Sequence, residues 1–323
     1  MSTLAILVIL ALIFDFLNGF HDSSNIVATI IFSRAMSPRA ALTMTAVAEF
    51  SGPFLFGVAV AKTIGEGIIL PGAISITVIL AALSSAIFWN LFTWYFGIPS
   101  SSSHALIGAL IGAVVVSAGW GTIMLPGLLK VVLALFLSPI LGFTVGFLFT
   151  RLIFFLARNA TPKINWFFRH LQILTGLGLG LSHGANDAQK TMGVITLGLV
   201  TIGYLDSFSV PIWVIAASAG AISLGTAIGG WRLIRTLGAK FYKIRPVHGF
   251  STQLSSAGVI LGAALLGGPV STTQVVSSTI LGVGAAQRIS MVRWQVMNSI
   301  LLAWLLTIPA TAIVSALFYY LFS

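Results

Sequence analysis

The amino-acid sequence predicts an all-α polytopic membrane protein built from two inverted-topology repeats, with roughly 10–12 membrane segments, some of them broken or re-entrant helices. Three observations lead to this prediction. Only 7% of the 323 residues are charged, where soluble proteins have about 25%. Hydrophobic residues make up 58% of the chain, and the mean hydropathy is +1.07. Short motifs also recur in the same order in the two halves.

The membrane segments follow from the distribution of the charges. The chain has no charged residue between Glu66 and Lys130, and a transmembrane helix needs about 20 apolar residues, so at least two segments fit there. So little charge excludes a soluble protein of this length. We expect no nucleic-acid partner despite the net charge of +10, because the basic residues lie in short loops between apolar segments. The N-terminus has no basic stretch before its apolar run, which predicts a membrane segment rather than a cleaved signal peptide.

The internal repeat appears as five motifs whose copies lie 165–173 residues apart. We predict a first repeat over 1–156, a basic cytoplasmic linker over 157–164 and a second repeat over 165–323. The paired positions are Asp22 and Asp187, Thr63 and Thr236, Ser84 and Ser255, Pro99 and Pro269, and Pro139 and Pro309.

Loop charges indicate that the two repeats have opposite orientations. The loop with Arg34 and Arg39 corresponds to a region around Asp206 that has no basic residue. In two further pairs of equivalent loops, only one loop of each pair is rich in basic residues. The positive-inside rule explains this difference if the second repeat is inverted. We expect both termini outside and a multi-pass protein of the plasma membrane. The basic residues of the two further loops are Arg232, Arg235, Lys240, Lys243, Arg245, Arg288 and Arg293.

Polar residues interrupt apolar helices at two places in each half, which predicts breaks in mid-membrane. These places are 18–25 and 97–104, with counterparts at 182–190 and 268–274. Gly and Pro supply the breaks, and Asp, Ser and Thr are good N-caps for the helices that restart. Each restart directs free N–H groups and the positive end of a helix dipole at the cavity. Four such N-termini would form an anion site suited to a phosphate-like oxyanion.

The carboxylates Asp22 and Asp187 make sense in an anion site if cations bind there as well. Hard cations such as Na⁺ take carboxylate, hydroxyl and carbonyl oxygens. Moving a phosphate dianion into a cell held at about −100 mV costs roughly 4.6 kcal/mol. Two co-transported Na⁺ ions cancel that charge, so the sequence favours coupled transport with the two Asp residues as cation anchors.

The motifs GFHDSSNIVAT, PSSSSHAL, SHGANDAQKTMG and PVSTTQVVSS closely resemble the paired signatures of the inorganic phosphate transporter (PiT) family. The resemblance covers nearly the whole chain. It implies inverted repeats, inorganic phosphate as substrate, and symport with Na⁺ or H⁺, with no cofactor besides the transported ion. Two features depart from the family pattern: Gln274 stands where a His is common, and the 151–169 linker is short.

The candidate site residues combine the resemblance with the polar motifs. Glu49 lies within an apolar run and has no acidic counterpart, so we predict either a further cation ligand or proton-sensitive group, or a packing role. Asp15 is similarly ambiguous. The candidate phosphate ligands are Asn25, Ser101, Ser102, Ser103, Gln189, Lys190, Ser271, Thr272 and Thr273. The candidate Na⁺ ligands are His21, Asp22, Glu49, Asn186 and Asp187.

Other functions remain as alternatives at this stage. H⁺ can replace Na⁺ as the coupling ion. An intramembrane hydrolase would use the two Asp residues as a dyad, or a Ser with His104. Against it, the HExxH pattern is absent and catalysis has no need of inverted pairs of motifs. A passive anion channel leaves the carboxylates unexplained. The lipid bilayer is an expected partner, and assembly into a homo-oligomer is left open.

Overall fold

The structure is a computed structural model that describes residues 2–70, 72–98, 100–240 and 243–323. These residues form twelve α-helices and two short 3₁₀ helices. Helices dominate because a segment in lipid must satisfy its backbone hydrogen bonds internally. The helices are α1 (Ser2–Phe32), α2 (Pro38–Phe56), α3 (Ala59–Glu66), α4 (Ile76–Phe96), α5 (Ser102–Ala118), η1 (Trp120–Thr122), α6 (Leu125–Leu156), α7 (Ile164–Thr201), α8 (Ile212–Ile228), α9 (Trp231–Lys240), α10 (Pro246–Leu265), α11 (Thr272–Gln287), η2 (Ile289–Met291) and α12 (Trp294–Phe322).

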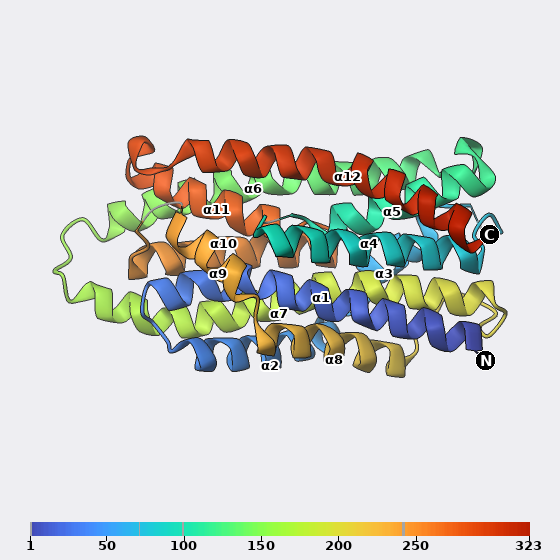
Figure 1. Ribbon diagram of the computed structural model, residues 1–323. Coiled ribbons are helices and arrows are strands. Elements are labelled where there is room, and N and C mark those ends of the chain that lie inside the picture. Colours follow the sequence, from blue (N-terminus) through green and yellow to red (C-terminus); the bar gives the residue numbers. More distant parts are fainter. Residues whose placement is uncertain (1, 71, 99, 241–242) are drawn as a thin grey trace.

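The order of elements in α1–α6 is repeated in α7–α12. Each set has a long helix, a medium helix followed by a short one, a pair of helices, a 3₁₀ turn and a second long helix. The equivalent helices α1 and α7 run in opposite directions, and so do α6 and α12 (Figure 1). Both termini lie at one end of the molecule, and the α6–α7 loop lies at the other. The predicted fold class is confirmed, while the division at 157–164 stays a prediction.

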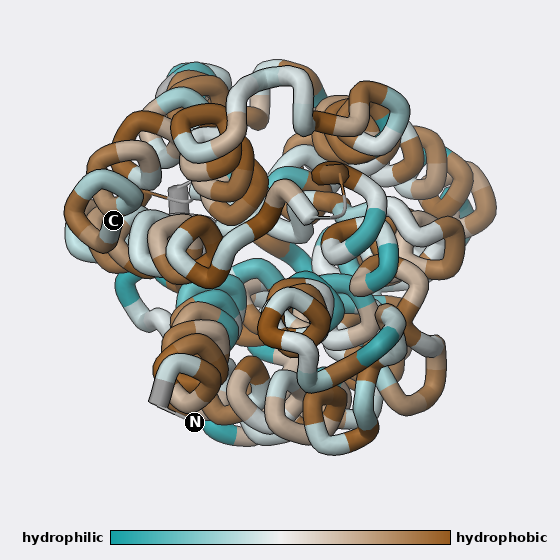
Figure 2. The backbone as a smooth tube through the Cα atoms, turned by 90° about the vertical axis from the view of Figure 1, so that its right-hand side faces the viewer, coloured by the Kyte–Doolittle hydropathy of each residue, from teal (hydrophilic) through white to brown (hydrophobic). Residues whose placement is uncertain are grey.

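The side chains are arranged as in a protein that is surrounded by lipid. Seen along the long axis, hydrophilic segments gather in the middle and hydrophobic segments form much of the outer ring (Figure 2). Large apolar side chains are exposed along α6 and α12, for example Ile140 and Ile313. Within the described residues, α1, α4, α6 and α12 contain stretches long and apolar enough to cross a membrane, and the bent α2–α3 pair adds a fifth if it is one span.

The predicted helix breaks at the two Gly-x-x-Asp motifs are wrong, because α1 and α7 run through them without interruption. The glycines instead allow a second helix to approach. A Cβ atom at Gly19 would lie 2.0 Å from the carbonyl oxygen of Ile222 in α8, and one at Gly184 would lie 2.1 Å from that of Glu49 in α2. Small residues permit such close helix crossings in membranes. Two of the four expected helix N-termini are therefore replaced by tight helix contacts.

The other predicted pair of breaks is present. A non-helical segment separates α4 from α5, and another separates α10 from α11; the predicted Pro99 lies outside the described residues. The α4–α5 pair occupies the half of the molecule toward the termini, and α10–α11 occupies the opposite half (Figure 1). The two breaks meet near the centre, where Ser103 Oγ donates to the carbonyl oxygen of Val270 at 3.0 Å.

Two further bends were not predicted from the sequence. α2 and α3 meet at 77°, and Gly57 at this bend has a φ of 82°. Gly229 has a φ of 77° at the corresponding point between α8 and α9. Arg232 and Arg235, which were expected in a loop, consequently lie on the short helix α9.

Candidate functional site

The polar motif of α1 forms one inward-facing stripe. Asp15, Asn18, Asp22 and Asn25 follow one another at three- or four-residue intervals, which places them on the same face of a helix. All four are at most 1% exposed. Ionisable residues buried within membrane helices are costly and mark functional sites.

The stripe on α7 is the counterpart of the one on α1, but its side chains differ. At a separation of 165 residues, His183 corresponds to Asn18, Asp187 to Asp22, and Lys190 to Asn25. His183, Asp187 and Lys190 are likewise at most 1% exposed. Each stripe therefore has an Asp at the same position, but the residues one helical turn before and after that Asp differ between the two stripes.

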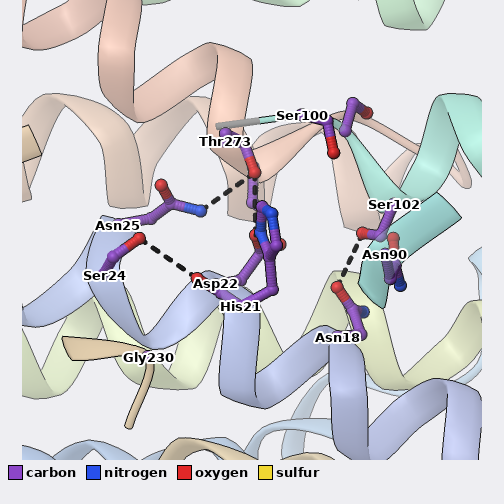
Figure 3. A network of polar contacts seen from close by, with 12 residues as sticks. Asn18, His21, Asp22, Ser24, Asn25, Asn90, Ser100, Ser102, Gly230 and Thr273 are labelled. Carbon is purple, nitrogen blue, oxygen red and sulfur yellow. Dashed lines mark hydrogen bonds and ion pairs between the residues drawn. The ribbon is translucent and has the colours of Figure 1, made fainter. Parts of the chain in front are cut away.

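Two helix N-termini open toward these stripes. The Oγ atom of Ser101 caps α5 by accepting from His104 N at 3.1 Å, and that of Ser271 caps α11 by accepting from Gln274 N at 3.3 Å. The first amides after each cap have no carbonyl within their helix to bind, and they lie at the positive end of the helix dipole. Ser102 Oγ also donates to Asn18 Oδ1 at 2.6 Å, which connects α5 to α1 (Figure 3).

The two carboxylates converge on one buried point. Thr272 Oγ1 lies 3.1 Å from Oδ2 of both Asp22 and Asp187. His183 Nε2 lies 3.7 and 3.6 Å from the same two oxygens. One ligand atom from each of Asp22, His183 and Asp187 falls within 4.8 Å of the others, an arrangement that could hold a metal ion. Two like charges at this distance repel each other unless a cation lies between or beside them.

The remaining contacts of Asp22 come from α1 and α11. Its Oδ1 atom accepts from Thr273 Oγ1 at 2.8 Å and lies 3.2 Å from His21 Nδ1 (Figure 3). Asn25 Nδ2 donates to the same Thr273 hydroxyl at 3.0 Å. Asn25 Oδ1 is buried and has no hydrogen-bond partner in the described part of the chain.

Asp187 has a lysine as its neighbour. Lys190 Nζ lies 2.7 Å from Asp187 Oδ1 and donates to Ser103 Oγ at 2.6 Å and to the Val270 carbonyl at 3.0 Å. These contacts join α7 to the N-terminus of α5 and to the segment that precedes α11.

Glu49 reaches the same cluster from α2. Its Oε1 atom lies 2.8 Å from His183 Nδ1, and both side chains are fully buried. The sequence prediction included Glu49 but missed His183. Two signals pointed to His183: it precedes Asp187 by one helical turn, and it occupies the repeat position of Asn18.

The site gathers most of the acidic groups of the chain. Four of the six carboxylates of the chain, Asp15, Asp22, Glu49 and Asp187, are fully buried in the middle of the bundle. The buried basic side chains beside them are Lys190, His183 and His21. The cluster is therefore a place where positive charge is stabilised.

Two predicted ligands hold neighbouring backbone instead of reaching the carboxylates. Gln189 accepts from Val60 N at 2.7 Å and donates to the Gly57 carbonyl at 2.5 Å, so its amide bridges the α2–α3 bend. Asn186 donates to the Gly268 carbonyl at 3.1 Å and accepts from Val270 N at 3.3 Å. Their roles as phosphate and Na⁺ ligands stay predictions.

A comparison with known protein families identifies the chain. A sequence model described as the phosphate transporter family matches it twice, over residues 18–165 and 155–315. This chain belongs to the phosphate transporter family. Within the family, it is 45% identical over 320 residues to a probable low-affinity inorganic phosphate transporter of Bacillus subtilis, covering 98% of this chain and 96% of the relative. It is 46% identical over 316 residues to one of Rhizobium meliloti, covering 97% and 95%.

A solved structure supports the same assignment. This phosphate transporter superposes on a sodium-dependent phosphate transporter with a TM-score of 0.90 and 26% identity, covering 99% of both chains. The family and these relatives are transporters, which excludes the intramembrane hydrolase considered above. The resemblance to phosphate transporters predicted from the sequence motifs is confirmed.

One motif difference can now be placed in this phosphate transporter. Gln274, where the family pattern often has His, lies beside His104, its counterpart in the first half, with Nε2 atoms 3.4 Å apart. His104 Nδ1 in turn lies 2.7 Å from Ser101 Oγ. This pair connects the first turns of α5 and α11 behind the N-termini that face the carboxylates.

Proposed function

We propose that this transporter carries inorganic phosphate into the cell by symport with cations, Na⁺ in preference to H⁺, through alternating access. The observation that supports the proposal best is the meeting of two helix N-termini with two carboxylates at one buried point. Helix N-termini bind oxyanions, and carboxylates bind hard cations. A site that contains both suits an anion that arrives together with cations.

In this proposal phosphate binds at the N-termini of α5 and α11. The donors are the free amides of the first turns and the hydroxyls of Ser102, Ser103, Thr272 and Thr273. Asn25, whose amide already donates to Thr273, adds a further donor. Several N–H and O–H groups around one anion are the arrangement that phosphate-binding helix N-termini use.

Cations are required by charge balance. Asp22 and Asp187 bring two buried carboxylates to the same point, so a phosphate dianion that enters there meets like charge. Co-transported cations that bind in this cluster offset this repulsion. They also remove the cost of moving the anion against a membrane potential that is negative inside, about 2.3 kcal/mol per charge per 100 mV. The name of the structural neighbour, a sodium-dependent phosphate transporter, supports Na⁺ as the cation.

Alternating access is supported by the closed state of the site and by a polar route on one side of it. Asp22, Asp187 and the Ser and Thr residues of both N-termini are at most 2% exposed. From the site toward the end with the α6–α7 loop, Gln253 donates to Thr29 at 3.0 Å and accepts from Thr175 at 2.6 Å. Farther along, Ser33 donates to Gln172 Oε1 at 2.7 Å. Thr29 lies on α1, Thr175 and Gln172 on α7 and Gln253 on α10, and Ser33 directly follows the end of α1.

The corresponding positions on the other side of the site are apolar. By the repeat, Gln172 corresponds to Leu7 and Ser33 to Gly198. Leu7 packs on Gly198, where a Cβ atom would lie 2.4 Å from the Leu7 side chain. A hydrated opening therefore forms more easily at the end with the α6–α7 loop. The positive-inside rule assigns this end, which carries Arg34, Arg158 and other basic residues, to the cytoplasm.

The test is uptake of radiolabelled phosphate by proteoliposomes that contain the purified protein. An inward Na⁺ gradient is expected to drive phosphate accumulation. Uptake that does not respond to Na⁺ but follows an imposed proton gradient would replace Na⁺ with H⁺ as the coupling ion. Uptake that responds to neither gradient and only equilibrates phosphate would contradict symport and favour a channel.

A further inference from the structure

We propose that Lys190 is a tethered cation: its ammonium group fills one of two pseudo-symmetric cation positions beside Asp187 and Asp22. The transporter then carries one mobile cation fewer per phosphate than a site in which both positions are free. This inference rests on the proposed cation symport and specifies its stoichiometry.

The surroundings of the Lys190 ammonium group are those of a bound metal cation. Its three acceptors are a carboxylate oxygen of Asp187, the hydroxyl oxygen of Ser103 and the backbone carbonyl oxygen of Val270, at 2.6–3.0 Å. Unwound helix ends and carboxylates supply this same set of oxygens to Na⁺ in transporters. An ammonium group has three N–H donors, so all of them are engaged by protein atoms.

The repeat defines the equivalent position in the other half. Asp22 corresponds to Asp187, Thr273 to Ser103, and Asn25 to Lys190. The structure preserves the relation, because Asn25 Nδ2 contacts Thr273 Oγ1 at 3.0 Å just as Lys190 Nζ contacts Ser103 Oγ at 2.6 Å. Asn25 is uncharged, so Asp22 has a carboxylate and a neighbouring hydroxyl but no tethered ammonium group (Figure 3).

An oxygen without a hydrogen-bond partner on Asn25, about one helical turn after Asp22, supports a mobile cation in this half. Asn25 is 1% exposed, and its buried Oδ1 atom has no hydrogen-bond partner among the described residues. A buried polar atom without a partner is costly and points to a group that binds it during function. Asp22, Thr273 and Asn25 together offer a carboxylate, a hydroxyl and an amide oxygen, which are ligands for Na⁺. Lys190 Nζ lies 2.7 Å from Asp187, whereas His183 Nε2 is almost equally distant from Asp22 and Asp187, at 3.7 and 3.6 Å, so the mobile cation belongs to Asp22.

The test exchanges the residues at the two equivalent positions, 190 on α7 and 25 on α1. Lys190→Asn gives α7 the residue that α1 has, and Asn25→Lys gives α1 the residue that α7 has. ²²Na⁺ and ³²P-phosphate uptake are measured in the same proteoliposomes at constant pH. We expect Lys190→Asn to carry one more Na⁺ per phosphate than the wild-type protein, and Asn25→Lys to carry one fewer. Lys190→Arg, which keeps the charge, serves as the matched control and should keep the wild-type ratio.

An unchanged Na⁺-to-phosphate ratio in Lys190→Asn would overturn the proposal. If the same variant also loses much of its phosphate affinity, Lys190 is a phosphate ligand instead. If Lys190→Asn transports nothing, ²²Na⁺ binding to the purified protein in detergent decides instead. One additional bound Na⁺ relative to wild type is expected, and equal binding refutes the tethered cation.

Failure of the symport itself gives a different pattern. If wild-type vesicles show no Na⁺-driven uptake, Na⁺ symport is wrong whatever the variants do. The net charge moved per phosphate, obtained from the membrane potential at which phosphate flux reverses, still tests Lys190 with any coupling cation. That charge should be more positive by one in Lys190→Asn, and an unchanged charge contradicts the proposal.

Discussion

Replacing Gly184 with Ala tests whether the glycine of the α7 motif serves helix contact. The added Cβ atom would lie 2.1 Å from the Glu49 carbonyl oxygen and 2.7 Å from its Cα atom, whereas ordinary contacts begin at 3.4 Å. α2 and α7 must therefore move apart by about 1 Å. Overpacking of this kind costs about 1–3 kcal/mol. The gain in helix propensity from Gly to Ala, about 0.5–1 kcal/mol, offsets only part of it.

The assay is thermal unfolding of the purified protein in detergent. Gly184→Ala should lower the midpoint by several degrees. Gly178→Ala on the same helix is the matched control, because a Cβ atom there meets nothing within 4 Å. We expect this control to leave the midpoint unchanged or to raise it. If Gly184→Ala is as stable as Gly178→Ala, the close α2–α7 crossing does not explain the glycine, and the reasoning is refuted.

Three further predictions follow from the site and its access route. Asp22→Asn and Asp187→Asn should each abolish cation-dependent phosphate uptake, because each removes a carboxylate that balances a cation; uptake like that of wild type would contradict this role. Gln172→Leu, which copies the apolar residue of the other half, should slow uptake about tenfold by raising the barrier to opening about 1.4 kcal/mol; an unchanged rate would exclude the polar route. Gln189→Leu should lower stability by about 1–3 kcal/mol in thermal unfolding, because it leaves buried amide and carbonyl groups of the α2–α3 bend without partners; an unchanged midpoint would show that the bend does not depend on this bridge.

The membrane fold and its inversion could be predicted from the sequence because lipid imposes strong constraints on composition. Scarce charge and long apolar runs indicate segments surrounded by lipid, and basic loops indicate which side of the membrane a loop lies on. The helix breaks were harder to predict. Glycine both interrupts helices and lets helices touch, and Gly19 and Gly184 serve contact. Gly57 and Gly229, which lie at actual bends, were not singled out. The difference depends on which helix lies opposite, and a single sequence does not contain that information.

In the site, too, some residues could be predicted from the sequence alone, whereas others depend on which helices pack together. Asp22, Asp187 and the two Ser/Thr tracts stand out in the sequence because they repeat and because charge is rare. His183 does not repeat, since its counterpart is Asn18, and it therefore escaped the search for paired motifs. Its proximity to Glu49 arises only when α2 packs on α7. Searching for positions where the two halves differ in charge would have found it.

The halves of this transporter share a backbone but not a set of charges. The contact between Gly19 and Ile222 has its counterpart between Gly184 and Glu49, so the scaffold remains symmetric where the chemistry does not. Packing alone therefore does not account for a buried Glu in place of Ile, or for Lys190 in place of an Asn. Alternating access by rocking of inverted repeats requires two halves of similar shape. Binding one anion with a fixed number of cations requires only that the total charge be correct. In the symport that we propose, the symmetric scaffold would support the motion, and the unequal residues at equivalent positions would determine which ions move.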